Sequence, residues 1–297
     1  MYWSTHSKPV PLSEIGWINT SYLSSYTPRC DPMLVWGTTV DMEALEPFLA
    51  SQRRQSGMIV STAHVLIRAV SESLCKHPEV NRRVIGKKVY QYDGVNVVMP
   101  MLQTSSGEVD SIFLHGVQEM SLDQIARQVW DEARQRAQQV AEERRRKKEG
   151  TSFKSVCAAI AKWAHLQWVY RMSNIGFLSA NQFRFPTIWN WERELYGANA
   201  FVNYLGSPGA PPLIAHKPAA LPMNSYSVYV TLGPTEPRAV VVDNKVVVRK
   251  QASLFVRLDH RMVNGHQAGN FVSTLRGYLA DPQSLIQEKE CVTMRAA

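Results

Sequence analysis

The stretch 254–269 constrains the fold of this chain more than any other. It reads LFVRLDHRMVNGHQAG: an apolar run with strand character ends at Asp259 and His260, and helical spacing begins five residues after the histidine. A histidine at such a corner is well placed for general base chemistry, because its ordinary pKa of about 6.5 leaves much of it neutral at physiological pH. A surface ion pair or a structural histidine is the alternative interpretation of an adjacent Asp and His.

Length and composition indicate an ordinary globular protein. The 297 residues are enough for one large domain or two small ones, and 45% apolar with 20% charged residues is a usual balance. The sequence contains no run of eighteen apolar residues, so we expect no membrane span. The N-terminus lacks the pattern of a signal peptide. The four cysteines lie far apart without a CxxC pair, which argues against a zinc site or a disulfide framework and favours the cytoplasm.

The net charge of +8 is concentrated in one block, residues 144–148. Basic residues late in a helix interact favourably with the helix dipole, so we expect a solvated helix end. No nucleic-acid motif accompanies the block, and we expect no nucleic-acid partner. Glycine spacing shows no phosphate-binding loop, and no pair of side chains at ligand spacing predicts a metal site.

The order of the predicted elements indicates an α/β fold. Mixed strands and helices precede a run of consecutive strands, which predicts a two-layer sandwich with a mixed β-sheet. Residues 1–30 are expected to be irregular. The predicted strands are 34–40, 95–102, 109–117, 200–206, 226–233, 238–242, 245–249 and 254–258, and the predicted helices are 42–55, 62–75, 121–148 and 265–280.

The strands 238–242 and 245–249 are expected to form a tight hairpin through Asp243 and Asn244. In that register one face carries only small and β-branched apolar residues, whereas the other face mixes valines with charges. We expect the apolar face to lie on the core side. Its residues are Ala239, Val241, Val246 and Val248.

The corner after the last strand carries a family resemblance. Asp259-His260-Arg261, two apolar residues and Asn264-Gly265 closely resemble the DHRxxDG signature of the acyltransferase core of 2-oxoacid dehydrogenase complexes, and chloramphenicol acetyltransferase has the related HHxxxDG form. The run His77-Pro78-Glu79-Val80-Asn81 after a helix resembles that family too. The resemblance covers about residues 30–286. It implies a single acyltransferase-like domain over 1–297 with a divergent segment at 151–200 and without a lipoyl or peripheral-subunit-binding domain.

By this resemblance, His260 and Asn264 are the catalytic residues, and His260 is the base that takes a proton from the acceptor nucleophile. Asp259, Arg261 and Gly265 support the corner, where Asn264 stands at the position of the family's usual Asp. Asparagine keeps the shape and an acceptor oxygen of aspartate but loses its charge.

The resemblance also implies a donor to the oxyanion of the tetrahedral intermediate. The family places a Ser or Thr hydroxyl just before Asn-Leu-Gly, and the segment 200–206 (AFVNYLG) has Asn203 at that position. A rival match is Ser173-Asn174-Ile175-Gly176. The spacing to His260 favours Asn203.

The activity implied is the transfer of an acyl group from a coenzyme A or carrier-protein phosphopantetheine thioester to a small acceptor, with no tightly bound cofactor. Family members are trimers or multiples of trimers with the active site in a channel between subunits. The apolar and aromatic segment 156–191 is packed core, or else a lid over the acyl chain or a weak contact with a membrane surface. The alternative function is a non-catalytic, trimer-forming scaffold.

Overall fold

The computed structural model describes residues 7–11, 14, 33–85, 88–102, 109–148, 198–206 and 226–287. A six-stranded mixed sheet with the order β2-β9-β8-β7-β5-β6 forms the centre of the fold. β7 runs parallel to β5 and β8, and the other neighbours are antiparallel. Its strands are β2 (Met33–Asp41), β5 (Val97–Leu102), β6 (Val109–Leu114), β7 (Ala200–Tyr204), β8 (Val228–Val242) and β9 (Lys245–Asp259). The predicted α/β sandwich with a mixed sheet is confirmed.

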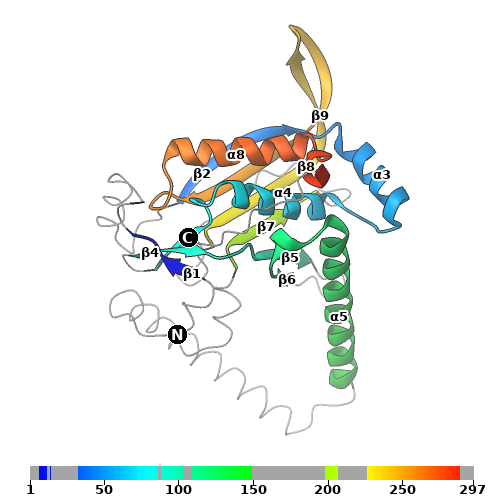
Figure 1. The fold of residues 1–297 in the computed structure, drawn as a ribbon. Helices are drawn as coiled ribbons and strands as arrows, with labels where there is room; N and C mark the ends of the chain where they lie inside the picture. Colours follow the sequence, from blue (N-terminus) through cyan, green and yellow to red (C-terminus); the bar gives the residue numbers. More distant parts are fainter. Residues whose placement is uncertain are drawn as a thin grey trace.

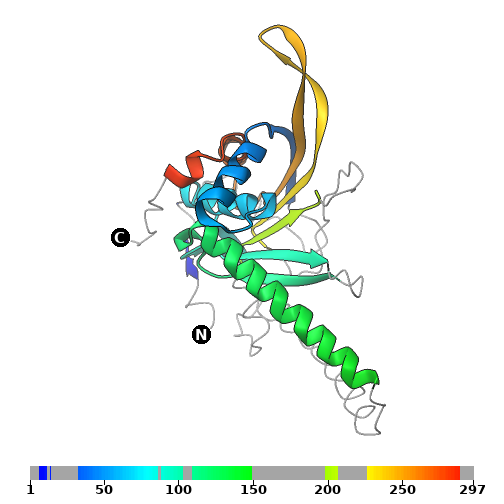
Figure 2. The ribbon, with the colours of Figure 1, turned by 90° about the vertical axis from the view of Figure 1, so that its right-hand side faces the viewer.

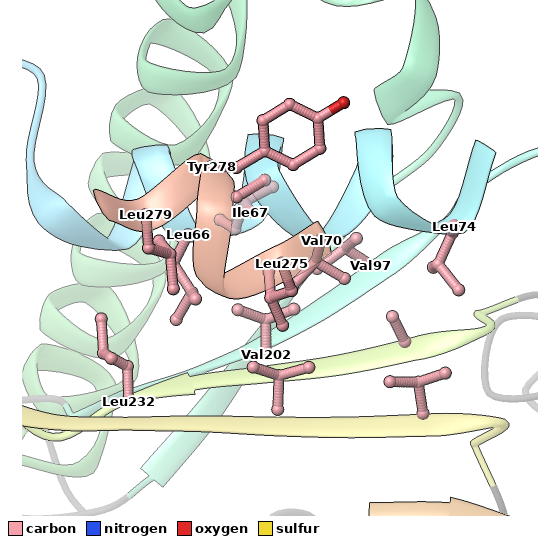
Figure 3. Packing of buried hydrophobic residues seen from close by; sticks show 14 of the residues in the cluster. Leu66, Ile67, Val70, Leu74, Val97, Val202, Leu232, Leu275, Tyr278 and Leu279 are labelled. Carbon is pink, nitrogen blue, oxygen red and sulfur yellow. The ribbon is translucent and has the colours of Figure 1, made fainter. Parts of the chain in front are cut away.

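Helices cover one face of this sheet (Figure 1). Two of them, α4 (Thr62–Lys76) and α8 (Gly265–Ala280), lie side by side over its middle. α4 has Ser61 as its N-cap and is buried almost all round, because it packs between the sheet and its neighbouring helices. Figure 3 shows the layer from close by: Leu66, Ile67, Val70 and Leu74 of α4 and Leu275, Tyr278 and Leu279 of α8 lie over Val97, Val202 and Leu232 of the sheet.

The remaining elements flank this sandwich. A second, three-stranded sheet has the order β1-β4-β3, so residues 1–30 are not irregular throughout as expected. The shorter helices lie at the ends of the main ones. These elements are β1 (Ser7–Pro9), β3 (Arg82–Ile85), β4 (Lys88–Tyr92), α3 (Leu45–Ser56), the 3-10 helix η2 (Val117–Glu119) and α9 (Ser284–Gln287).

The long helix α5 (Leu122–Lys148) extends away from the body of the molecule (Figure 2). A capping box starts it, since Ser121 and Gln124 exchange hydrogen bonds between side chain and backbone. Ile125 and Val129 are buried, whereas Ala137 is exposed, so only the first part of the helix packs against the body. Arg145 is exposed, as a solvated helix end requires.

The hairpin of β8 and β9 differs most from expectation. Each is one continuous fifteen-residue strand, whereas the sequence predicted shorter separate strands. Asp243 and Asn244 form the predicted two-residue turn with φ values of 49° and 60°, as a type I′ turn needs. The outer half of the hairpin projects beyond the helices as an arm (Figures 1 and 2).

The predicted register of this arm is confirmed, but the predicted burial is wrong. Val241 pairs with Val246 and Ala239 pairs with Val248. Val241, Val246 and Val248 are 70%, 75% and 72% exposed, respectively. The face continues that of Ala252 and Leu254, which is buried beneath the helices, but the arm extends past the helices and its valines are exposed there.

Two smaller differences from the sequence-based expectations remain. The helix expected from Met42 begins at Leu45, because the Asp41 carboxylate accepts the Glu43 N–H and stabilises a turn instead. Cys75 is disulfide-bonded, contrary to the expectation from cysteine spacing. Distance along the chain does not limit which thiols meet in the fold. Residues 151–197, and with them the segment 156–191 and the rival motif 173–176, lie outside the described residues.

Two absences hold for the part of the chain that is described. None of its helices is both long and apolar enough to cross a bilayer. Its His, Cys, Asp and Glu side chains form no group of three that could hold a metal ion.

Candidate active site

The candidate site is the tight corner between β9 and α8. The backbone carbonyl of Asp259 accepts hydrogen bonds from the N–H groups of Met262 and Val263 at 3.1 and 3.4 Å, which turns the chain back on itself. Met262 and Val263 are buried at 2% and 0% exposure, so their apolar side chains anchor the corner in the core. His260, which precedes these two residues in the turn, is half-buried.

The ring of His260 is oriented by the corner itself. Its Nδ1 lies 2.8 Å from the backbone carbonyl oxygen of Val263. A carbonyl oxygen can only accept a hydrogen bond, so Nδ1 carries the proton in this arrangement. In the neutral ring Nε2 then keeps its lone pair, which is the form that a general base requires.

Asp259 is engaged by Arg261 rather than by His260. The Arg261 Nε lies 2.9 Å from Asp259 Oδ1 and its terminal nitrogen lies 2.6 Å from Oδ2, a bidentate ion pair. The Arg261 backbone N–H donates to the same carboxylate at 3.0 Å. The side chains are only 7% and 12% exposed, so this pair is largely desolvated and rigid. Through this ion pair both residues stabilise the turn.

Asn264 is the N-cap of α8. Its side-chain oxygen accepts the Gln267 N–H at 3.0 Å, and the Gln267 side chain accepts the Asn264 N–H at 3.0 Å. This reciprocal pair is a capping box. The structure thus assigns Asn264 a positioning role in the corner, which an aspartate could fill with the same geometry.

Sequence reasoning missed Gln267, although an Asn followed three residues later by Gln is a known start signal of helices. Gly265, by contrast, has no steric need to be glycine in this chain. A Cβ built there meets no atom within 4 Å, and its φ lies outside the left-handed region.

The helix that follows the corner is fixed to α4. His77, just past the end of α4, places its Nε2 2.8 Å from the Thr274 hydroxyl of α8. Its ring also meets Phe271 edge-on, with the ring centres 6.1 Å apart. The histidine of the His-Pro-x-x-Asn run therefore clamps α8 in place and does not belong to the reacting groups.

The asparagine of that run positions β7. Asn199, which immediately precedes β7, donates from its side chain to the Asn81 side-chain oxygen and to the carbonyl of Gly94 at 2.6 Å. Its own side-chain oxygen accepts the Asn96 N–H. Asn81 and Asn199 are both fully buried, so every polar atom of this network depends on its partners.

Asn203 is not brought to His260 within one chain. It lies on β7 opposite Thr231 of β8, which lies opposite Phe255 of β9. His260 follows Phe255 by five residues, so the two are separated by about 16 Å along the strands and about 10 Å across them. Asn203 lies on the face away from the helices, since its neighbour Val202 is in the core.

This sheet, its helices and the histidine corner define a class of protein. The fold is that of chloramphenicol acetyltransferase, whose structure matches with a TM-score of 0.50 at 12% identity over 92% of this chain and 99% of that one. The dihydrolipoamide acetyltransferase of Azotobacter vinelandii matches with a TM-score of 0.55 at 18% identity, over 94% of this chain and 93% of that one. The cubic core of a pyruvate dehydrogenase multienzyme complex matches with a TM-score of 0.55 at 19% identity, over 94% of this chain and 93% of that one.

The sequence itself narrows the class. Residues 217–287, which contain the corner, match the family described as 2-oxoacid dehydrogenases acyltransferase (catalytic domain). The lipoamide acyltransferase component of the branched-chain alpha-keto acid dehydrogenase complex of Pseudomonas putida is 43% identical over 51 residues, 17% of this chain and 12% of that protein. The dihydrolipoyllysine-residue acetyltransferase component of the Bacillus subtilis pyruvate dehydrogenase complex is 29% identical over 98 residues. These residues are 32% of this chain and 20% of that protein. The chain thus matches a fifth or less of the length of these curated relatives, which are acyltransferases, and the resemblance is confirmed.

Proposed function

We propose that this protein is an acyltransferase that moves an acyl group from a coenzyme A or carrier-protein thioester to a small acceptor, with His260 as the general base. The observation that carries the proposal is the contact between His260 Nδ1 and the Val263 carbonyl, because it places the ring proton on Nδ1 and the lone pair of the neutral ring on Nε2. A single domain over 1–297 without a tightly bound cofactor is part of the same proposal.

The chemistry needs few parts. His260 Nε2 takes the proton of the acceptor's thiol, hydroxyl or amine as that atom attacks the thioester carbonyl carbon. The carbonyl oxygen becomes a tetrahedral oxyanion, which needs a hydrogen-bond donor. Collapse breaks the carbon–sulfur bond, and the thiolate leaves as a thiol with the proton that His260 carries. The acyl group ends on the acceptor and the base is regenerated.

Asn203 is the proposed oxyanion donor, through its side-chain amide. Because one chain keeps Asn203 and His260 far apart, the proposal requires that Asn203 come from a neighbouring copy. A trimer, or a multiple of three, meets this requirement, since a rotational ring brings one face of each copy against a different face of the next. The solved cubic core supports it as well, because cubic symmetry contains threefold axes.

Asn264 is proposed to act with His260 by fixing the corner. In the Azotobacter vinelandii enzyme, the catalytic mechanism has been investigated at one serine, one histidine and an asparagine four residues after that histidine. His260 and Asn264 have the same spacing and the same residue types. This supports a neutral amide as a working residue at this position. We further propose that segment 156–191 covers the acyl end of the channel.

The proposal is tested with purified protein and a panel of acyl-coenzyme A esters, in which thiol release is followed with and without thiol, hydroxyl and amine acceptors. His260→Ala should reduce acceptor-dependent release by about 10²–10⁴-fold, the usual contribution of a positioned base. Trimer formation and melting temperature should hardly change. Equal slow rates for wild type and His260→Ala across the whole panel would contradict the proposal and leave the non-catalytic scaffold.

A further inference from the structure

A second cluster of reactive side chains lies where α4 meets α8, apart from the His260 corner. The hydroxyl oxygen of Thr274 on α8 lies 2.8 Å from Nε2 of His77. Across the same ring, Nδ1 of His77 lies 3.5 Å from a carboxylate oxygen of Glu79. A hydroxyl within reach of a base, with the base oriented by an acid, is the arrangement that activates serine or threonine as a nucleophile.

The end of α4 builds this arrangement. His77 precedes a proline and leaves the helical region, with φ of −122° and ψ of 68°. The chain then turns back, because the Val80 N–H donates to the His77 carbonyl at 2.9 Å and the Asn81 N–H donates to the Pro78 carbonyl at 3.0 Å. Glu79 lies within this turn and reaches one edge of the His77 ring, while the other edge meets α8.

The two contacts select one tautomer of His77. A carboxylate can only accept, so the ring proton lies on Nδ1 facing Glu79, and Nε2 of the neutral ring accepts the hydrogen bond of the Thr274 hydroxyl. The 3.5 Å contact is longer than an ordinary hydrogen bond, as catalytic contacts often are before a substrate binds. Phe271 packs edge-on against the ring with 6.1 Å between the ring centres, which fixes the plane of the imidazole.

The stripe of α8 that carries Thr274 also offers hydrogen-bond donors and space. The exposed Asn270 lies one turn before Thr274, and Tyr278 lies one turn after it, with the Lys76 ammonium 5.0 Å from the tyrosine ring centre. An amide and an ammonium are donors of the kind that an oxyanion requires. At the exposed Gly277 a Cβ would meet no atom within 4 Å, so the surface beside the half-buried Thr274 has room for a small ester.

We propose that Thr274, His77 and Glu79 form a second catalytic site, which hydrolyses esters of small acyl groups. The Thr274 oxygen attacks the ester carbonyl carbon while His77 Nε2 takes its proton. The carbon–oxygen bond to the alcohol breaks, the alcohol leaves with that proton, and the acyl group stays on Thr274. A water molecule then gives a proton to Nε2 and attacks the acyl carbon, which releases the carboxylic acid and restores the threonine hydroxyl. Glu79 does not meet the ester and acts as a positioning residue for the ring.

This site is separate from the corner of the proposed acyl transfer. Thr274 lies about 15 Å along α8 from the N-cap Asn264, at a rise of 1.5 Å per residue. His77 takes no part in the chemistry of His260. The inference therefore does not depend on acyl transfer, and removing one activity should leave the other intact.

The test follows the release of 4-nitrophenol from 4-nitrophenyl acetate by the full-length protein with His260→Ala, so that the corner adds nothing to the rate. In this parent protein, Thr274→Val removes the hydroxyl but keeps the shape of the side chain, and Thr274→Ser keeps a hydroxyl. Ser273→Ala is the matched control, because it removes an exposed hydroxyl from the same helix. Rapid acid quenching followed by peptide mass spectrometry locates the acetyl group left on the protein.

Thr274→Val should lower the rate at least ~10²-fold, whereas Thr274→Ser should stay within ~10-fold of the parent and Ser273→Ala should equal it. Glu79→Gln should lower kcat by about 10-fold with little change in KM, because Glu79 orients the base and does not meet the ester. The quenched parent should carry the acetyl group on Thr274. Circular dichroism checks the fold, and if Thr274→Val does not fold, the position of the acetyl group and the rates of Glu79→Gln decide.

The competing account is a purely structural clamp between the two helices. A rate no faster than spontaneous hydrolysis, or equal rates for the parent and Thr274→Val, would leave only that clamp and overturn the inference. An acetyl group found on other residues, such as the Lys76 amine, and not on Thr274 would overturn it as well.

Discussion

His260 and Val263 are joined across the corner by a 2.8 Å contact between the imidazole Nδ1 and a backbone carbonyl oxygen. The tautomer of the proposed base is therefore set by main chain three residues away and not by a carboxylate. Asp259, the adjacent acid in sequence, is occupied by Arg261 instead. The corner thus separates two tasks: Val263 orients the base, and the ion pair keeps the turn in shape.

The first prediction concerns the assembly of the site. His260→Ala and Asn203→Ala should each be nearly inactive, and mixing the two after unfolding and joint refolding should restore part of the activity. In mixed assemblies some interfaces pair an intact His260 with an intact Asn203 from another copy. Acceptor-dependent thiol release is the measurement. Refolding each variant alone is the control, and a mixture no more active than the separate variants would place both residues' roles within one chain.

The cap of α8 can be separated from catalysis by a series at Asn264. Asn264→Ala removes the acceptor for the Gln267 N–H and should lower the free energy of unfolding by about 1 kcal/mol. Asn264→Asp keeps that acceptor and adds a charge that the helix N-terminus favours, so stability should stay within ~0.5 kcal/mol or rise. Chemical denaturation gives the stabilities. A loss with Asp as large as that with Ala would show that the corner depends on a neutral residue.

Removing only one partner of the Asp259–Arg261 ion pair should lower the free energy of unfolding strongly. Arg261→Ala leaves a largely buried carboxylate with only a backbone donor, and we expect a loss of about 3 kcal/mol in unfolding free energy. Asp259→Asn combined with Arg261→Ala should recover part of that loss, since no uncompensated charge is then buried. Denaturation of the single and double variants measures the coupling. A double variant less stable than Arg261→Ala alone would contradict this account.

A histidine away from the site should control stability in acid. Burial lowers the pKa of His64 from its ordinary value to about 4. Its Nδ1 accepts the Ser61 N–H at 3.1 Å, so protonation would replace this cap by two opposed donors. Because the folded pKa is depressed, the unfolded chain binds more protons between pH 6.5 and 4. Stability is therefore complete above about pH 6.5 and falls by up to ~3 kcal/mol as the pH drops through that range.

The matched variant for this acid effect is His64→Gln, which does not titrate and completes a Ser-x-x-Gln capping box. Its thermal stability should fall less steeply than that of wild type between pH 6.5 and 4. The comparison requires melting curves of both proteins at a series of pH values. Parallel pH profiles would show that His64 is not the responsible group.

Much of the corner could be read from the sequence because its interactions are local. Asp259 to Arg261, His260 to Val263 and Asn264 to Gln267 each join residues at most three apart. The same holds for the turn at Asp243 and Asn244, whose residue types tolerate the positive φ that the turn requires. The mixed sheet also followed from the pattern of elements.

Only the tertiary structure decided which side of an element is covered and which residues of different strands lie close together. The alternation of the arm correctly predicted which residues share a side, but whether that side is covered depends on where α4 and α8 end in space, and so Val241, Val246 and Val248 are exposed. The separation of Asn203 from His260 depends on the registers of three strands that are remote in sequence. A pattern with a period of two or 3.6 residues describes neighbours along the chain; the distance between strands and the reach of a helix depend on how the whole fold packs.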